Sequence, residues 1–372
     1  MANSYSSPDF TINTNCNWSD LAGYKGSAID ANDNINLSSN AILSLDTPGQ
    51  IYAKLITGAG TLAYNQAGVI LNANITATAN TILTLAANSI SIVGNLTGSA
   101  SAGAQACAIT GGTLTVTGQI QGGGVAAAHG ILCTTGSVDI SNCTITGGIT
   151  ATAVQGVSIA SGMTNVTLTG VVCTGGISGT NNHGILYAKT TIWTGLVASA
   201  TGGAGITCHG LSCSALTGNI GVTNGCTLCK GGSGTTCHGL NLVTVGYAGS
   251  VQLAKCVGGS AINCHGFTNP ATSVTATYIF DLLVGGIVEG AFGAKINSGT
   301  SLTVTAVDCS NTGSPIMWGV ATTISFASSG RISLKTASDY VSLSSNSSIG
   351  PYHIDDVNVG PLIKPFGPYP II

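Results

Sequence analysis

The amino-acid sequence predicts an all-β protein, a single-stranded parallel β-helix (β-solenoid) with coils of about 27 residues. Three observations predict this class. A His-Gly signature returns at a nearly constant interval, short alternating runs of apolar and polar residues lie between glycines, and charged residues are scarce.

The repeated signature is His-Gly followed by an apolar residue. It occurs at His129-Gly130-Ile131, His183-Gly184-Ile185, His209-Gly210-Leu211, His238-Gly239-Leu240 and His265-Gly266-Phe267. Related copies stand at Gln155-Gly156-Val157, Phe292-Gly293-Ala294 and Trp318-Gly319-Val320. Neighbouring copies follow one another at intervals of about 27 residues, with little variation between them. Such a regular interval indicates one structural unit stacked on itself.

Short strand patterns fill the interval between signatures. Alternating apolar runs such as 51–55, 81–85 and 90–93 are separated by Gly or Asn, and no run of useful length has helical periodicity. In a typical copy a Gly-Gly pair follows the last run, as at Gly147-Gly148. We expect these pairs at corners where the backbone needs positive φ.

Charge is unusually low, with 9 Lys and Arg and 12 Asp and Glu in 372 residues. Because nucleic-acid binding needs clustered basic residues, we expect no nucleic-acid partner. The longest apolar stretch, 278–292, contains Asp281 and Glu289, so we also expect no membrane span. A net charge of −3 gives little repulsion between copies and favours self-association.

Three segments follow from these patterns. Residues 1–50 hold five of the twelve carboxylates and are expected to form an N-terminal cap or attachment segment. Residues 51–337 are the expected solenoid. Residues 338–372 contain five of the nine prolines and predict an extended arm, whose apolar end we expect to dock on its own solenoid or on a neighbour.

The repeat pattern over roughly residues 60–335 resembles that of right-handed parallel β-helix proteins, a class that includes viral tail spikes and fibres, pectin-degrading enzymes and adhesins. The resemblance rests on the period and the strand pattern. It implies an elongated stack of coils and identifies no single family.

The histidine row is the first candidate site. His183, His209, His238 and His265 should stack one coil apart, and Cys208, Cys237 and Cys264 each precede a histidine. Imidazole and thiolate suit zinc or copper. However, adjacent residues on a strand point to opposite faces, and Gln155, Phe292 and Trp318 occupy the same row. We therefore favour structural stacking and predict neither a metal nor a cofactor.

A second row of cysteines precedes the Gly-Gly corners. Its members are Cys143, Cys173, Cys229, Cys256 and Cys309. Long rows leave no natural disulfide pairing, and the first residues lack the basic and apolar regions of a signal peptide. We expect free buried thiols and folding in a reducing compartment.

Enzymatic activity would depend on few carboxylates, because only Asp139, Asp281, Glu289 and Asp308 occur between residues 47 and 338. Asp281 and Asp308 are one repeat apart in the sequence and could face one another about 5 Å apart, as in retaining glycosidases. A tail-spike-like glycan depolymerase is therefore an alternative. We nevertheless predict no enzyme and no catalytic residues.

Threonine-rich runs such as 113–117, 146–152 and 303–305 are similar to the flat Thr-x-Thr faces of ice-binding solenoids. Threonine is also favoured in any exposed strand. Because the runs do not keep one register along the sequence, we expect no ice-binding face, although an adhesin or ice-binding solenoid stays an alternative.

The predicted function is that of a non-enzymatic structural protein, most consistent with a virion surface, fibre or capsid-associated component assembled in a host cytoplasm. Its expected partner is itself, as a homo-oligomer or filament that forms through the C-terminal arm and the solenoid ends. Other virion proteins are further candidate partners.

Overall fold

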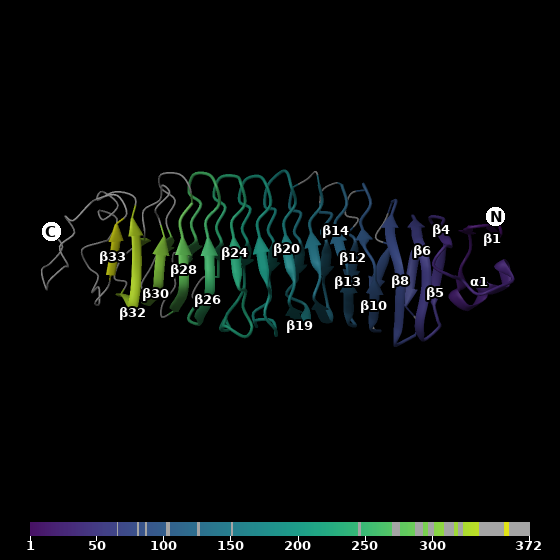
Figure 1. Cartoon of the computed structure of the whole chain (residues 1–372), viewed down its shortest axis with the longest axis horizontal. Coiled ribbons are helices and arrows are strands. Elements are labelled where there is room, and N and C mark those ends of the chain that lie inside the picture. The colour runs from purple at the N-terminus through teal and green to yellow at the C-terminus, as the bar shows by residue number, and fades with distance from the viewer. Residues whose placement is uncertain are drawn as a thin grey trace, which may run out of the picture. The chain divides into compact units, whose positions relative to one another are not determined.

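The computed structural model describes residues 1–64, 66–79, 82–85, 88–101, 105–124, 127–149, 152–244, 247–269, 276–286, 293–296, 301–308, 316–318, 323–334 and 353–356. The fold is all-β, with stacked parallel strands that form about ten solenoid turns. The predicted β-solenoid class is therefore confirmed (Figure 1).

The chain divides into two compact units. The N-terminal unit comprises Met1–Gly184 together with Trp193–Gly195, and the C-terminal unit comprises Ile185–Ile192 together with Leu196–Ile372. In each unit the chain passes once per coil through two parallel sheets, which we call the A and B sheets.

The N-terminal unit contains the first coils. Its A-sheet strands are β2 (Asp9–Ile12), β4 (Asn34–Leu37), β6 (Gly49–Gly58), β8 (Val69–Ala77), β10 (Ile90–Val93), β11 (Leu96–Thr97), β13 (Leu114–Thr117), β14 (Gln119–Gln121), β17 (Thr144–Thr146) and β20 (Val172–Thr174). Its B-sheet strands are β3 (Cys16–Asn17), β5 (Ile42–Leu45), β7 (Thr61–Tyr64), β9 (Leu83–Leu85), β12 (Cys107–Ile109), β15 (Ile131–Cys133) and β18 (Val157–Ile159). A third, two-stranded sheet joins β16 (Gly136–Ser141) to β19 (Met163–Thr169) in parallel.

The C-terminal unit repeats the two-sheet plan. Its A-sheet strands are β22 (Ser199–Thr201), β24 (Leu228–Lys230), β26 (Ser250–Val257), β28 (Thr277–Val284), β30 (Ser301–Asp308), β32 (Thr323–Leu334) and β33 (His353–Asp356). Its B-sheet strands are β21 (Ile185–Tyr187), β23 (Leu211–Cys213), β25 (Leu240–Leu242), β27 (Phe267–Thr268), β29 (Ala294–Ile296) and β31 (Ile316–Trp318).

Alternation of side chains builds the core. Along β8 the side chains of Val69, Leu71, Ala73, Ile75 and Ala77 are buried, while the residues between them are partly or fully exposed. Because equivalent inward residues stack from coil to coil, each coil adds apolar surface to the interior of its own unit. Burying one such Val, Leu or Ile side chain contributes about 1.5–3 kcal/mol.

The expected cap segment, residues 1–50, contains both a helix and the first parallel pairs. Helix α1 (Trp18–Lys25) begins after Asn17, whose backbone N–H donates to the Asp20 carboxylate at 3.0 Å. It buries Trp18 and Leu21. Strand β1 (Ser4–Ser6) pairs antiparallel with β2, but β2 already pairs in parallel with β4. Coil stacking therefore begins inside this segment.

Only a small part of the expected C-terminal arm is described. Strand β33 pairs in parallel with β32, with Arg331 opposite His353. These four residues thus continue the A sheet of the C-terminal unit. The rest of 338–372 lies outside the described residues, and the docking of the arm stays a prediction.

The Gly-Gly corners require glycine, but not for the reason predicted from the sequence. The Gly232 N–H donates to the Cys208 carbonyl at 2.8 Å, and a Cβ on Gly232 would lie 1.8 Å from the Gly203 carbonyl oxygen. Likewise, a Cβ on Gly148 would lie 1.9 Å from the Gly123 carbonyl oxygen. Neither Gly148 nor Gly232 has positive φ. The prediction of positive φ is wrong here, because close backbone approach sets the requirement.

Candidate functional site

The predicted histidine row forms a buried column in the N-terminal unit. Its members there are Gln105, His129, Gln155 and His183. The His129 Nδ1 accepts a hydrogen bond from the backbone N–H of Gln155 in the next coil, at 3.1 Å. The Gln155 side chain donates to the Asn181 carbonyl at 2.8 Å. His129 and Gln155 thus pair with backbone groups of the following coil.

The same column in the C-terminal unit consists of stacked imidazoles. Neighbouring rings of His209, His238 and His265 lie 4.9 Å apart between centroids and are inclined by 7°. The backbone N–H of His238 donates to His209 Nδ1 at 3.0 Å, and that of His265 donates to His238 Nδ1 at 3.1 Å. The expected structural stacking is present in the coils of these three histidines.

Hydrogen bonding fixes the protonation state of these rings. An Nδ1 that accepts a backbone N–H carries no proton, so His129, His209 and His238 are neutral with the proton on Nε2. Burial lowers the pKa of His129 to about 4. Burial, together with the charges of His265 and Lys295, lowers the pKa of His238 to about 3. The column is therefore a neutral structural element near pH 7.

The column differs from the predicted row at two positions. Gln105 belongs to it, because the pairing of Cys107 with Ile131 places Gln105 opposite His129. No glycine follows Gln105, so the His-Gly motif did not identify this position. Trp318 does not belong to it, because Trp318 pairs with Ile296 and Ile316 takes the place expected for Val320. The coil from Ala294 to its partner Ile316 is shorter than the usual repeat, which shifts the register. Phe292 lies outside the described residues.

Three cysteines form a second buried column next to the histidines in the C-terminal unit. The backbone N–H of Cys208 donates to Cys237 Sγ at 3.1 Å, and that of Cys237 donates to Cys264 Sγ at 3.2 Å. All three residues have no exposed surface. In the N-terminal unit the corresponding positions hold Ala128, Val154 and Asn182.

The predicted row of five cysteines is only partly a row. Cys229 and Cys256 are direct partners in β24 and β26, but Cys173 pairs with Ile145 rather than Cys143. The prediction is wrong for Cys143, because the coil between Cys143 and Cys173 has a length that places Ile145, two residues after Cys143, opposite Cys173. Cys309 lies outside the described residues. None of the twelve described cysteines forms a disulfide, and eleven of them are buried.

The carboxylate pair considered for catalysis is not aligned. Asp308 pairs with Val284, which lies beyond Asp281 along β28. Three residues of strand span about 10 Å, so the expected face-to-face spacing of about 5 Å is wrong. The physical reason is that Thr277 lies opposite Ser301, so the coil between β28 and β30 is shorter than the usual repeat.

A row of single threonines, one per coil, keeps its register in the N-terminal unit. Strand pairing aligns Thr57, Thr76, Thr97, Gln121, Thr146 and Thr174 on the outward face of the A sheet. The intervals between these residues lengthen along the row, so the row is invisible to a fixed period. Asn74 and Asn95 each lie two positions before a threonine of the row, and the Asn74 side chain accepts the Asn95 backbone N–H at 3.0 Å.

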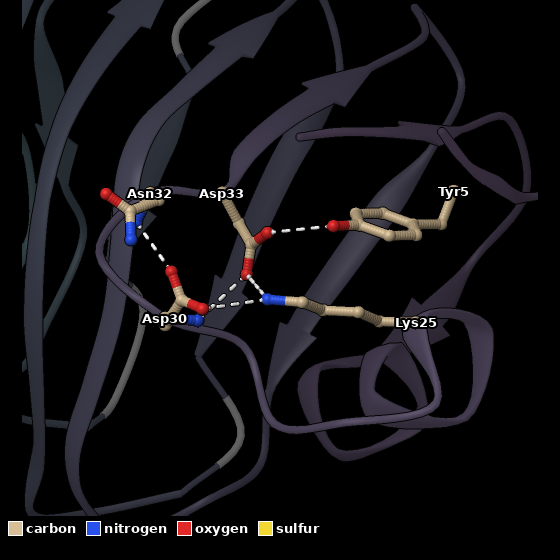
Figure 2. Close-up of polar contacts among 5 residues, drawn as sticks. All are labelled: Tyr5, Lys25, Asp30, Asn32 and Asp33. Atoms are coloured by element: carbon tan, nitrogen blue, oxygen red, sulfur yellow. Dashed lines mark hydrogen bonds and ion pairs between the residues drawn. The ribbon is translucent and has the colours of Figure 1, made fainter. Parts of the chain in front are cut away.

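A cluster of charged residues, missed by the sequence reasoning, lies beside α1 (Figure 2). The Lys25 ammonium contacts the carboxylates of Asp33 at 2.6 Å and Asp30 at 2.9 Å. Tyr5 donates its hydroxyl to Asp33 at 3.3 Å, and the Asp30 backbone N–H donates to Asp33 at 2.8 Å. Asp33 is 2% exposed, so its charge needs these partners.

This cluster acts as a clamp between the helix and the first coils. Hydrogen bonds from Lys25 to both carboxylates raise its pKa, and the bond from Lys25 lowers the pKa of Asp30. Because the ammonium already occupies the carboxylate oxygens, the cluster offers no open position for a metal or a substrate. Lys25, Asp30 and Asp33 form no recognisable motif in the sequence, so the sequence did not predict this cluster.

A shallow hollow of about 320 Å³ lies over β6 and β8. Its lining includes Lys54, Asn72 and Asn74 and contains no carboxylate. In the part of the chain that the structure describes, no group of three or more His, Cys, Asp or Glu side chains is placed to hold a metal ion.

Comparison with known proteins adds no family. No protein-family model matches the chain, and no curated protein matches its sequence significantly. Among the described residues, no helix is both long enough and apolar enough to span a bilayer.

Proposed function

We propose that this chain is a non-enzymatic structural protein that assembles with copies of itself, as a virion surface, fibre or capsid-associated component. The observation that carries the proposal is the column of neutral, backbone-bonded His and Gln side chains, which uses its polar groups to join coils. Such a column stabilises a stack and leaves the bonded Nδ1 atoms unavailable for chemistry.

The outer surface supports the same proposal. Only 6% of all residues are charged, so copies approach with little electrostatic cost. Solenoid coils also end in strands whose outer edge can pair with another chain. Shape and repeated weak contacts, rather than catalysis, would then be the mechanism.

Two truncations test the assembly. One chain stops after Asp356 and keeps β33, and the other stops after Gly350 and leaves the edge of β32 without this partner. Light scattering and negative-stain imaging of both, beside the full chain, report the oligomer. Loss of oligomers in both truncations assigns assembly to residues 357–372, while loss in the shorter chain alone assigns it to the strand edge. A full chain that stays monomeric would contradict the proposal.

The in-register threonine row favours a second candidate, an ice-binding surface. Strands one coil apart are about 4.7–4.9 Å apart, so Thr57, Thr76 and Thr97 present hydroxyl groups at that interval on the outward face of the A sheet. Thr97→Leu should then abolish inhibition of ice recrystallisation, whereas Thr84→Leu, on the exposed face of the B sheet, should not. Absence of any inhibition by the full chain would exclude this candidate.

A further inference from the structure

The thiols of Cys208, Cys237 and Cys264 form a continuous chain of contacts across three coils. The Cys237 Sγ accepts the backbone N–H of Cys208 at 3.1 Å, and the Cys264 Sγ accepts that of Cys237 at 3.2 Å. With Ala261 they form a small apolar cluster of their own under the corner loops. The middle sulfur therefore has a neighbour on each side, one coil away.

The spacing of this column suits a two-coordinate metal. Neighbouring coils are about 4.7–4.9 Å apart. With a metal–thiolate bond of about 2.3 Å, the zinc value, a linear sulfur–metal–sulfur unit spans about 4.6 Å. An ion between two adjacent sulfurs thus needs little movement of the backbone.

The number of ligands selects the metal. Structural zinc needs four tetrahedral ligands, and the described part of the chain brings no three ligating side chains to one point. A column offers two sulfurs at a time, in line. Soft thiolates in linear pairs suit a monovalent d10 ion such as Cu(I).

The proton balance is defined. Hydrogen bonding to Cys208, together with burial, raises the pKa of the Cys237 thiol, and the bond to Cys237, with burial, does the same for Cys264. Both thiols are therefore protonated, and binding of one Cu(I) releases two protons and leaves a bis-thiolate with one negative charge. The backbone N–H groups of Cys208 and Cys237 already point at Cys237 and Cys264 Sγ and would stabilise that charge.

We propose that the corner column of Cys208, Cys237 and Cys264 is a binding site for Cu(I), held linearly between Cys237 and either neighbouring sulfur. The site is independent of the proposed assembly function, because it uses buried corner thiols of one chain. It predicts an asymmetry among three equally buried cysteines, since Cys237 alone is shared by both pairs.

Anaerobic titration of the full chain with Cu(I), in competition with a chromogenic Cu(I) chelator, tests the site. Cys237→Ala leaves Cys208 and Cys264 two coils, about 10 Å, apart, so it should lose Cu(I) affinity at least tenfold. Cys208→Ala keeps the Cys237 and Cys264 pair and is the matched control, expected to bind like the wild type. Alanine suits the position because Ala128 occupies it in the N-terminal unit.

X-ray absorption of the wild type with one equivalent of Cu(I) should show two sulfur ligands and no nitrogen. Equal affinity in the Cys237→Ala and wild-type chains would overturn the proposal, as would nitrogen ligation or failure to take Cu(I) from the chelator. If Cys237→Ala does not fold by circular dichroism, the Cys208→Ala/Cys264→Ala chain replaces it. This chain also retains no adjacent pair and should lose Cu(I) affinity in the same way.

Discussion

The two units build the same corner with different side chains. In the N-terminal unit the backbone N–H of Val154 donates to the Asn182 side chain at 2.9 Å. In the C-terminal unit the N–H of Cys208, at the same position of its coil, donates to Cys237 Sγ at 3.1 Å. At these two corners the buried N–H thus finds its acceptor in the next coil, an amide in one unit and a thiol in the other, because a buried N–H without a partner is costly.

The outward faces vary from coil to coil. The residue before each Gly-Gly corner is Gln121, Thr146 or Thr174 in the N-terminal unit and Thr201, Lys230 or Val257 in the C-terminal unit. The backbone ladder continues regardless of this change. Outward residues are thus free to carry function, while inward columns are constrained by packing and hydrogen bonding.

Acidification is expected to produce the largest effect and to separate the units. Burial lowers the pKa of His129 and His183 to about 4, and that of His238 and His265 to about 3. The unfolded histidines titrate near 6.5, so their stabilisation is complete above that pH and is lost as pH falls. At pH 4 the loss is about 3 kcal/mol for each histidine with a fully lowered pKa.

Hydrogen exchange between pH 7 and pH 3 checks this difference. Protection of the amides around His129 and His183 should stop declining near pH 4, whereas protection around His238 and His265 should decline to about pH 3. Equal protection at pH 7 and pH 4 in both units would contradict the neutral columns.

A corner glycine tests whether both units depend on the same close approach. Gly232→Ala places a Cβ against the Gly203 carbonyl, and Gly148→Ala does the same against Gly123. Each should reduce the free energy of unfolding by about 3 kcal/mol, because backbone rather than a flexible side chain must move. Gly218→Ala is the control, since its Cβ would lie 3.6 Å from the nearest atom. Denaturant unfolding gives the comparison, and equal stability of the Gly218 and Gly232 variants would refute the close-approach argument.

Removing an acceptor from the histidine column should cost less. His238→Leu leaves the buried N–H of His265 without its partner, which costs about 1–3 kcal/mol in unfolding free energy. His238→Gln should recover part of this loss, because Gln155 occupies the same column in the N-terminal unit. Thermal unfolding of the two variants decides the point. A Leu variant as stable as the Gln variant would show that stacking alone matters.

The smallest effect is expected at the strained position two residues before each histidine. Thr207 and Thr236 have φ of 60° and 59°, whereas Asn181 stands at φ 58° in the N-terminal unit. Asparagine tolerates this region better than a β-branched residue, so Thr236→Asn should stabilise by about 1 kcal/mol. Thr235→Asn, at the preceding position, should leave the melting temperature unchanged. A lower melting temperature for Thr236→Asn would reverse the interpretation.

The sequence by itself determined the fold class, the period and the histidine column. A His-Gly signature that returns once per repeat can be satisfied only by stacking like on like, so His209, His238 and His265 had to lie near one another. The alternation of apolar residues likewise determined which side of each strand is buried. Both signals are local, and both repeat within one coil.

The tertiary structure alone decided which residues of neighbouring coils are partners. Corner loops absorb insertions and deletions, while backbone hydrogen bonds and inward packing keep the strands in register, so equal spacing in sequence does not imply adjacency. Because the loops vary in length, Asp281 is not aligned with Asp308, and Trp318 does not lie in the histidine column. For the same reason Thr57, Thr76 and Thr97 are aligned although the sequence intervals between them are unequal. The Lys25 and Asp33 clamp was hidden for the same reason, because only folding of the first coils brings the helix to that carboxylate.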